Sequence, residues 1–451
     1  MNNHSVSRRT FIQLGTAVGG ALGLGLTEFG RVRAQVPQFG GTIPGFGPLV
    51  PTATENTGEV LLKLPEGFKY NVLIRNGNVM SDGRPFPSNA DGMGAFDYNG
   101  MVRLVCNHER TGGPAIGSFP YDAGAGGGTT TLTFDPASRL LTDSFVSSSG
   151  HVRNCAGGIT PWGTWLTCEE TTQGTTATYQ RQHGYIFEVP AFADTEVLTE
   201  PLRHLGLHYP EAAVVDPKTG VVYITSDRGP CGTFRFVPSV PGDLTQPGRV
   251  QMLAIEGLPQ YDTRMNQQTK VKLPVAWVDI DDPSNEAAYR ATGGLHTYQQ
   301  GLAKGGATFS RGEGAWYSRN SVFFACSNGG NAGLGQIFEL HLKNNDVQEL
   351  ELVFESVDAA AMAAPDNMCV SPSGNNMIIC EDGSGAEYLH LLRRSGNQIY
   401  QLAENIYPGQ TGSEWAGACF SPDGRTLFAN LQGASVMFAI WADRNRWASI
   451  T

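Results

Sequence analysis

Residues 214–227 read VVDPKTGVVYITSD and contain the pattern that decides the fold. An apolar pair leads into the turn DPKTG, and an alternating apolar strand follows it. Proline and glycine favour a tight reversal here, because Gly220 can adopt the positive φ that a hairpin turn needs. This stretch therefore predicts an antiparallel β-hairpin.

The same pattern recurs along the chain. Close copies read TFDPASRLLTDSF at 133–145, CVSPSGNNMIICED at 369–382 and CFSPDGRTLFANL at 419–431, and looser copies occupy 157–170 and 312–326. About six such hairpins, often about 50 residues apart, are typical of propeller blades of four strands each. We therefore expect an all-β chain that forms a β-propeller of six blades with loop insertions, the longest between residues 228 and 312. A sandwich or two stacked barrels is the competing all-β interpretation.

The first 34 residues have the features of an export signal. Residues 7–13, SRRTFIQ, carry a paired arginine followed by a hydrophobic pair, which is typical of a twin-arginine signal. The apolar stretch at 14–26 is too short to span a bilayer comfortably, and residues 32–34, VRA, resemble a cleavage site. We predict a signal peptide at 1–34, recognition by the twin-arginine export machinery, a periplasmic or extracellular location without a stable membrane span, and a single propeller domain at 35–451.

The composition argues against several classes of protein. With 31 basic and 42 acidic residues the formal net charge is −11 at pH 7, which disfavours nucleic acid as a binding partner. Eight cysteines without a CxxC pair disfavour a disulfide scaffold. The motifs HExxH, GxSxG and GxxxxGK[ST] do not occur in the sequence. Because the net charge is negative, any anionic substrate would need a local source of positive charge.

Acidic residues recur where apolar strands meet turns. They are Glu109, Glu169, Glu170, Asp227, Glu381 and Asp382 at strand ends, and Glu211, Glu313, Asp366 and Glu414 ahead of strands. In a propeller, such positions from different blades converge on the axial channel. Converging carboxylates repel one another and are costly to desolvate, so they need cations or protons between them. Oxygen donors without paired histidines favour hard cations such as Ca²⁺, and Fe³⁺ or Mn²⁺ also accept carboxylates.

Two further residues could take part in such a site. Cys155 lies in the polar, glycine-rich turn RNCAGG, where a thiolate could bind a metal. Arg311 and Glu313 are two residues apart in FSRGEGAWY and share a face if that segment is extended. An arginine fork beside a metal-binding carboxylate could hold phosphate oxygens, and a salt bridge to a neighbouring acid is the alternative role for Arg311.

Several segments form an ordered set along the chain. After the twin-arginine start they are NCAGGITPWGTWLTCEE at 154–170, PEAAVVDPKTGVVYITSDRG at 210–229, FSRGEGAWY at 309–317, PDNMCVSPSGN and ICEDG within 365–383, and EWAGACFSPDGRTLFANLQ at 414–432. Together they resemble the PhoX family of secreted alkaline phosphatases. The resemblance implies a catalytic propeller whose axial pocket holds Fe³⁺ and Ca²⁺ and hydrolyses small-molecule phosphate monoesters.

The resemblance also implies roles for individual residues. Cys155 resembles the thiolate ligand of iron, and Arg311 resembles the catalytic arginine that holds phosphate. The residues that resemble further metal ligands are Glu211, Glu313, Asp366 and Glu381, together with Glu169 or Glu170, between which the choice stays open. The lack of a serine elbow favours in-line attack without a protein nucleophile.

Two positions depart from the family pattern. Many members carry Glu where this chain has Ser226, and His where it has Pro210. Losing a carboxylate could remove or weaken a calcium site. Two other functions therefore stay open: a calcium-dependent propeller hydrolase of phosphodiesters, phytate or lactones, and a non-catalytic exported propeller that binds a ligand or partner through its channel.

Overall fold

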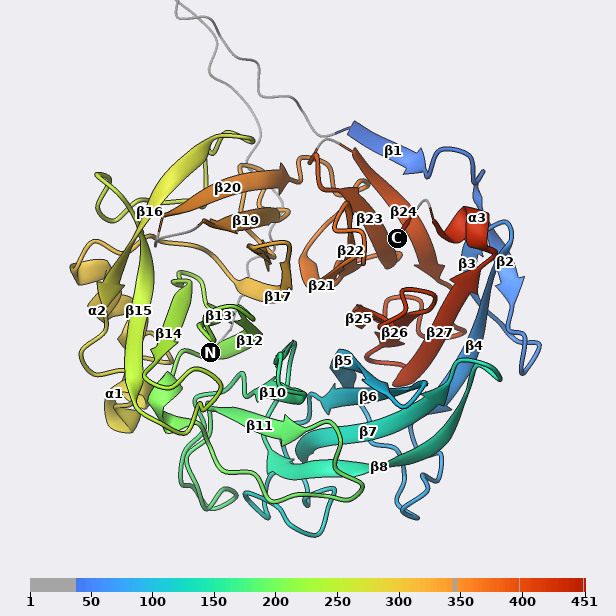
Figure 1. Ribbon diagram of the computed structural model, residues 1–451, viewed down its shortest axis with the longest axis horizontal. Coiled ribbons are helices and arrows are strands. Elements are labelled where there is room, and N and C mark those ends of the chain that lie inside the picture. Colours follow the sequence, from blue (N-terminus) through green and yellow to red (C-terminus); the bar gives the residue numbers. More distant parts are fainter. Residues whose placement is uncertain (1–37, 344–346, 397, 449) are drawn as a thin grey trace, which may run out of the picture. The chain divides into compact units, whose positions relative to one another are not determined.

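The computed structural model describes residues 38–343, 347–396, 398–448 and 450–451. Residues Gln35–Thr451 form one compact unit, and the predicted signal peptide at 1–34 lies outside the described residues. Within that unit strands dominate, and the sheets follow one another around a common centre (Figure 1). The prediction of an all-β propeller is confirmed. Among the described helices, none is both long and apolar enough to cross a membrane.

Two sheets come from the first half of the described chain. Strands β5 to β8 form a four-stranded antiparallel sheet, and β9 to β11 form a three-stranded one. Their bounds are β5 Ala90–Tyr98, β6 Met101–His108, β7 Gly127–Asp135, β8 Leu140–His151, β9 Gly158–Ile159, β10 Thr164–Cys168 and β11 Ile186–Pro190. A short 3-10 turn, Arg203–Leu205, precedes the next sheet.

The largest sheet has nine strands and joins two meanders through β16, which pairs with β15 and with β20. Its strands are β12 Pro210–Val215, β13 Val222–Ser226, β14 Phe234–Pro238, β15 Gly248–Ile255, β16 Lys272–Asp279, β17 Gly312–Ser318, β18 Ser321–Cys326, β19 Gln336–Leu342 and β20 Gln348–Glu355. The predicted insertion contains β16 and the helices α1 Glu286–Ala291 and α2 His296–Ala303. Because one sheet spans two meanders, the count of six blades stays a prediction.

The last two sheets combine strands from both ends of the described chain. They contain β1 Gln38–Thr42, β2 Leu49–Ala53, β3 Val60–Pro65, β21 Pro365–Val370, β22 Asn376–Glu381, β23 Tyr388–Arg393 and β24 Gln398–Asn405 in one sheet, and β4 Phe68–Arg75, β25 Trp415–Phe420, β26 Leu427–Leu431 and β27 Val436–Ala442 in the other. Helix α3, Arg444–Trp447, follows β27. The pairing of β4 with β27 closes the ring of sheets (Figure 1).

The innermost strands carry a β-bulge near their start, which positions the site. In β5, β12, β17, β21 and β25 the register against the neighbouring strand shifts within the first residues of the strand. A bulge re-aims a side chain and increases the local twist. Glycine permits close approach of these strands, since a Cβ on Gly92 would lie 2.0 Å from the carbonyl oxygen of Ala156.

Candidate metal centre

A cysteine and four acids occupy the same place in five repeats. Each lies two residues after a non-glycine residue whose φ is between 48° and 57°. We call these five the bulge set: Asp91, Cys155, Glu211, Glu313 and Asp366, preceded by Asn89, Arg153, Tyr209, Arg311 and Ala364. Left-handed backbone costs about 1–3 kcal/mol in such residues and concentrates at functional sites. The recurrence indicates that the same local backbone geometry is repeated around the centre.

A second set lies at the ends of the neighbouring strands. Each of the five repeats contributes one residue to this second set. The backbone N–H of that residue donates to the carbonyl oxygen of the left-handed residue of the same repeat, at 2.8–3.3 Å. We call these residues the strand-end set: Glu109, Glu170, Asp227, Ser327 and Asp382. Gln432 donates in a comparable way to the carbonyl oxygen of Glu414, at 3.1 Å. The backbone therefore ties each strand-end residue to the bulge of its own repeat.

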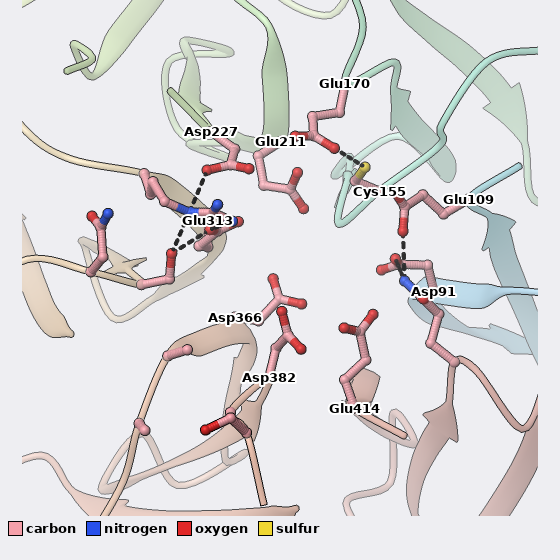
Figure 2. A pocket seen from close by; sticks show the side chains of 18 of the residues that line it. Asp91, Glu109, Cys155, Glu170, Glu211, Asp227, Glu313, Asp366, Asp382 and Glu414 are labelled. Carbon is pink, nitrogen blue, oxygen red and sulfur yellow. Dashed lines mark hydrogen bonds and ion pairs between the residues drawn. The ribbon is translucent and has the colours of Figure 1, made fainter. Parts of the chain in front are cut away.

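Both sets line one cavity of about 520 Å³, on which side chains from all five sheets converge (Figure 2). Its lining includes nine carboxylates, the Cys155 thiol and two arginines, Arg153 and Arg311. Three groups of side chains bring their ligand atoms within 4.8 Å of one another: Glu109 with Cys155 and Glu170, Asp91 with Glu109 and Glu414, and Glu211 with Glu313 and Asp366. The cavity therefore concentrates negative charge.

Burial and mutual repulsion perturb these acids. Burial, followed by the charge of Glu109, raises the pKa of Asp91 to about 7. Burial, followed by Asp366, raises the pKa of Glu414 to about 12. Burial, followed by the charge of a neighbouring carboxylate, likewise raises the pKa of four further acids well above the ordinary value: Glu170, Glu211, Glu313 and Asp366. Bound cations would relieve this repulsion and favour the charged forms.

The donor set fits the cations that the sequence predicts. Among the described residues that line the cavity, the acidic donors are nine carboxylates and one thiol, and no histidine accompanies them. Oxygen donors suit Ca²⁺ and Fe³⁺, and a thiolate suits iron better than calcium. Burial, with Glu211 and Glu170 nearby, raises the pKa of the Cys155 thiol well above its usual range. A cation beside Cys155 would reverse that effect.

Five of the seven predicted ligands line the cavity: Cys155, Glu170, Glu211, Glu313 and Asp366. Glu169 does not, because its fully buried carboxylate is used elsewhere. It accepts hydrogen bonds from Val152 N at 2.9 Å, from Gly184 N at 2.8 Å and from His183 Nδ1 at 2.6 Å. Burial alone raises its pKa, but His183 and His151 outweigh burial and lower the pKa of Glu169 to about 2.

Glu381 is also directed away from the cavity. Its carboxylate accepts from Ala363 N at 2.7 Å, from Tyr388 N at 3.2 Å and from His390 Nε2 at 3.0 Å. Like Glu169, it stands immediately before a strand-end residue, here Asp382. Because side chains alternate along a strand, the two neighbours point to opposite sides. At these two strand ends the carboxylates that line the cavity are therefore Glu170, which the sequence also offered, and Asp382, which it did not assign as a ligand.

Residues at this position share a different task, which is to hold the loop that leads into the bulge. Glu169 and Glu381 bind the backbone of Val152 and Ala363. His108 Nδ1 lies 3.1 Å from Ser88 O, and Ser226 Oγ donates to His208 O. Each of these four backbone groups belongs to the residue just before the left-handed one. We call His108, Glu169, Ser226 and Glu381 the brace set.

Arg311 forms the salt bridges that the sequence offered as its alternative role, and its position at the cavity leaves the phosphate-holding role a prediction. Its guanidinium lines the cavity and forms ion pairs with Asp227 Oδ1 at 3.1 Å and with Glu313 Oε1 at 3.2 Å. Nε also donates to Ser327 Oγ at 3.0 Å. These contacts fix the plane of the guanidinium at the cavity wall. Sequence reasoning did not single out Asp91 and Arg153, and it noted the acids Glu109, Asp227, Asp382 and Glu414 without assigning them as ligands.

Solved structures with a similar chain path are distant in sequence. A gluconolactonase from Xanthomonas campestris is 10% identical, with 88% of this chain and 98% of that chain covered and a TM-score of 0.40. The Swd1 β-propeller domain from Myceliophteria thermophila is 10% identical, with 80% and 98% covered and a TM-score of 0.42. A putative 6-phosphogluconolactonase from Bacteroides fragilis is 12% identical, with 89% and 92% covered and a TM-score of 0.41. We draw no functional argument from these similarities.

A search among curated proteins found no match. A family model described as alkaline phosphatase PhoX matches residues 45–131 and 123–435. The matched region includes the whole bulge set and the whole strand-end set. Since the match extends over most of the sequence, the chain belongs to the PhoX family of alkaline phosphatases.

Proposed function

We propose that this protein hydrolyses phosphate monoesters in the acidic cavity, with Fe³⁺ and Ca²⁺ bound there. Membership of the PhoX family supports a phosphatase. The observation that carries the proposal is the convergence of nine carboxylates and one thiol on a cavity of about 520 Å³. So many buried acids need cations to remain charged together.

The three ligand groups differ in chemistry. The group of Glu109, Cys155 and Glu170 contains the sulfur and would hold iron. The groups Asp91, Glu109, Glu414 and Glu211, Glu313, Asp366 offer only oxygen and would hold calcium. Bound ions would supply positive charge and Lewis acidity at the phosphoryl group.

The protein's own residues would bind and orient the substrate. Arg311 presents charged N–H groups that can hold phosphate oxygens while Asp227 and Glu313 keep its guanidinium in place. Ser327 Oγ is committed to Glu313 Oε1 at 2.6 Å, and no histidine lines the described cavity to act as its base. We therefore propose attack on phosphorus without a serine nucleophile.

Two measurements on one preparation test this function. Elemental analysis gives the metal content, and initial rates on a monoester, a diester and a lactone at matched metal loading give the reaction. We expect iron and calcium together, with the monoester fastest. Arg311→Gln should lower kcat by about 10²–10³-fold, whereas Arg264→Gln, which breaks an ion pair with Asp262 outside the cavity, should not.

The other outcomes point to the competing functions. Calcium without iron, with diester, phytate or lactone as the best substrate, would favour a calcium-dependent hydrolase. Loaded protein that hydrolyses none of these substrates would favour a non-catalytic binding module. A serine, threonine or cysteine found phosphorylated during turnover would refute attack without a protein nucleophile.

We further propose export through the twin-arginine machinery to the periplasm or the cell exterior. The proposal rests on the arginine pair Arg8 and Arg9 and the short apolar stretch at 14–26. R8K/R9K should leave the protein in the cytoplasmic fraction. Equal amounts of the variant and the parent outside the cytoplasm would contradict the proposal.

A further inference from the structure

We infer that Arg153 is a second anion-binding arginine of the cavity, and that it contacts phosphate oxygens of the substrate together with Arg311. This inference rests on the proposed function. Arg153 precedes Cys155 by two residues, as Arg311 precedes Glu313. The two arginines have φ values of 55° and 49°. They therefore occupy the same place in two repeats.

The backbone around the two arginines is held in the same way. The carbonyl oxygen of Arg153 accepts from Glu170 N at 3.0 Å, and that of Arg311 accepts from Ser327 N at 2.9 Å. Both arginine side chains line the cavity. The position two residues before Cys155 and Glu313 thus directs its side chain to the cavity wall in both repeats.

The guanidinium groups lie closer to solvent than the acids beneath them. The side chains of Arg153 and Arg311 are 35% and 45% exposed, whereas those of Glu170, Asp227 and Glu313 are 6%, 10% and 5% exposed. An anion that approaches this part of the wall from solvent therefore meets the two guanidinium groups before Glu170, Asp227 and Glu313. This order favours a negatively charged substrate in a strongly acidic cavity.

One pair of acids connects the two arginines. Arg153 forms an ion pair with Glu170, and Arg311 forms one with Asp227 at 3.1 Å. Glu170 and Asp227 both line the cavity, and their carboxylates lie on the same side of it in Figure 2. The two guanidinium groups therefore flank one carboxylate pair on the same part of the wall.

Each guanidinium retains a free donor group. Arg153 uses Nε and Nη2 on Glu109, at 2.9 Å and 2.7 Å, and Nη2 also contacts Glu170. Arg311 uses Nε and Nη2 on its own partners. Among the described residues, the Nη1 group of neither arginine has a hydrogen-bond partner. The carboxylates thus hold both side chains while Nη1 stays available to an anion.

Two arginines would favour a particular class of substrate. A phosphate monoester is a dianion with three non-bridging oxygens, whereas a diester is a monoanion with two. The second arginine adds charge-assisted hydrogen bonds that only the extra charge and oxygen of the monoester can fully use. Arg153 would therefore help to select monoesters over diesters. The competing interpretation is that Arg153 only neutralises Glu109 and Glu170.

The variants Arg153→Gln and Arg153→Lys separate these interpretations, with Arg264→Gln as the control. Both substitutions at position 153 keep a Cβ, so the left-handed backbone strain there stays the same. The readouts are metal content by elemental analysis, affinity for inorganic phosphate by calorimetry, and the ratio of monoester to diester rates. We expect R153Q to keep its metals and to bind phosphate about 10- to 100-fold more weakly. R153K should lose less, and R264Q nothing.

Two results would overturn the inference. One is an R153Q protein that binds phosphate within twofold of the parent and keeps the monoester preference. The other is an R153Q protein whose affinity falls only in proportion to lost metal, which would make Arg153 a partner of Glu109 and Glu170 alone. Failure of the proposed function itself would look different, because the parent protein would then lack iron, act fastest on a substrate other than the monoester, or hydrolyse none of the substrates.

Discussion

The assignment of Glu169 to the brace set makes a sharp prediction about two adjacent acids. Glu169→Gln replaces a carboxylate oxygen by an NH₂ group in a fully buried place where Val152 N, Gly184 N and His183 Nδ1 all approach as hydrogen-bond donors. The new amide can satisfy only part of them, and His183 loses one of its two charged partners and keeps Asp122. We expect the variant to be less stable and to keep most of its metal.

The magnitude follows from the contacts that are lost. Removing one partner of a buried, hydrogen-bonded ion pair costs about 3–5 kcal/mol, and each donor left unpaired costs about 1–3 kcal/mol. Because the glutamine oxygen still accepts one bond, we expect the free energy of unfolding to fall by about 3 kcal/mol. Glu170→Gln is the matched control. It removes a charge that burial and Asp227 disfavour, so the metal-free protein should change by less than about 1 kcal/mol while retaining less metal.

Urea unfolding of chelator-treated protein measures the first quantity, and elemental analysis of loaded protein measures the second. The brace assignment predicts opposite patterns: E169Q loses stability and keeps metal, and E170Q keeps stability and loses metal. The reasoning is refuted if E169Q loses an ion at unchanged stability while E170Q retains the full metal content, because Glu169 would then be the ligand.

Two further predictions concern cations and pH. Chelation should lower the thermal unfolding midpoint, with calcium and iron restoring it, because ions at a thousandfold excess over Kd stabilise a folded protein by about 4 kcal/mol; an unchanged midpoint would argue against bound cations. His341 lies against Glu339 and Glu351, with Lys272 and Arg394 nearby. Partial burial alone lowers the pKa of His341, but hydrogen bonds to the two acids raise it to about 9. The raised pKa of His341 stabilises the fold fully below about pH 6.5, and this stabilisation is lost once the pH passes about 9. After allowance for solvent screening, H341Q should therefore lower the free energy of unfolding by about 1 kcal/mol at about pH 6 and by almost nothing at about pH 10. A difference in urea midpoint that is equal at both pH values would contradict this account.

The hairpins were predictable because their turn chemistry is local. The stretch 214–227 folds as expected, with β12 and β13 on either side of a turn in which Gly220 has a φ of 71°. Closure of the ring by β4 and β27 has no local signal, since it joins segments from opposite ends of the described chain. The edge pairing of β16 with β20 also depends on tertiary contacts.

The convergence of acids was predictable, but the direction of each side chain was not. Sequence placed Glu169 and Glu170 at one strand end and Glu381 and Asp382 at another. Along a strand, a shift by one position moves a carboxylate from one face of the sheet to the other. The register shift between Pro365 and Met368 lies opposite the end of β22, so the local sequence does not show which of the two neighbouring acids faces the cavity.

Asp91 and Arg153 have signals that become clear only when the repeats are aligned. Asp91 lies in NADGM, which lacks a proline-glycine turn but matches APDNM around Asp366. Arg153 begins RNC as Arg311 begins RGE. The offset of two residues has meaning because the first residue adopts a left-handed backbone and the second lines the cavity. The amino-acid composition alone does not predict that geometry.

The departure at Ser226 affects the brace set and leaves the cavity unchanged. Pro210 and Ser226 are register partners at the first rung of β12 and β13, as Pro365 and Glu381 are in β21 and β22. A glutamate at this place accepts a backbone N–H, whereas the serine hydroxyl donates to a carbonyl, that of His208. Variation here therefore changes how the loop before the bulge is held, while the carboxylates of the bulge set and the strand-end set still line the cavity. The non-catalytic interpretation drew its support from a carboxylate lost at Ser226, and that loss does not remove an oxygen from the cavity.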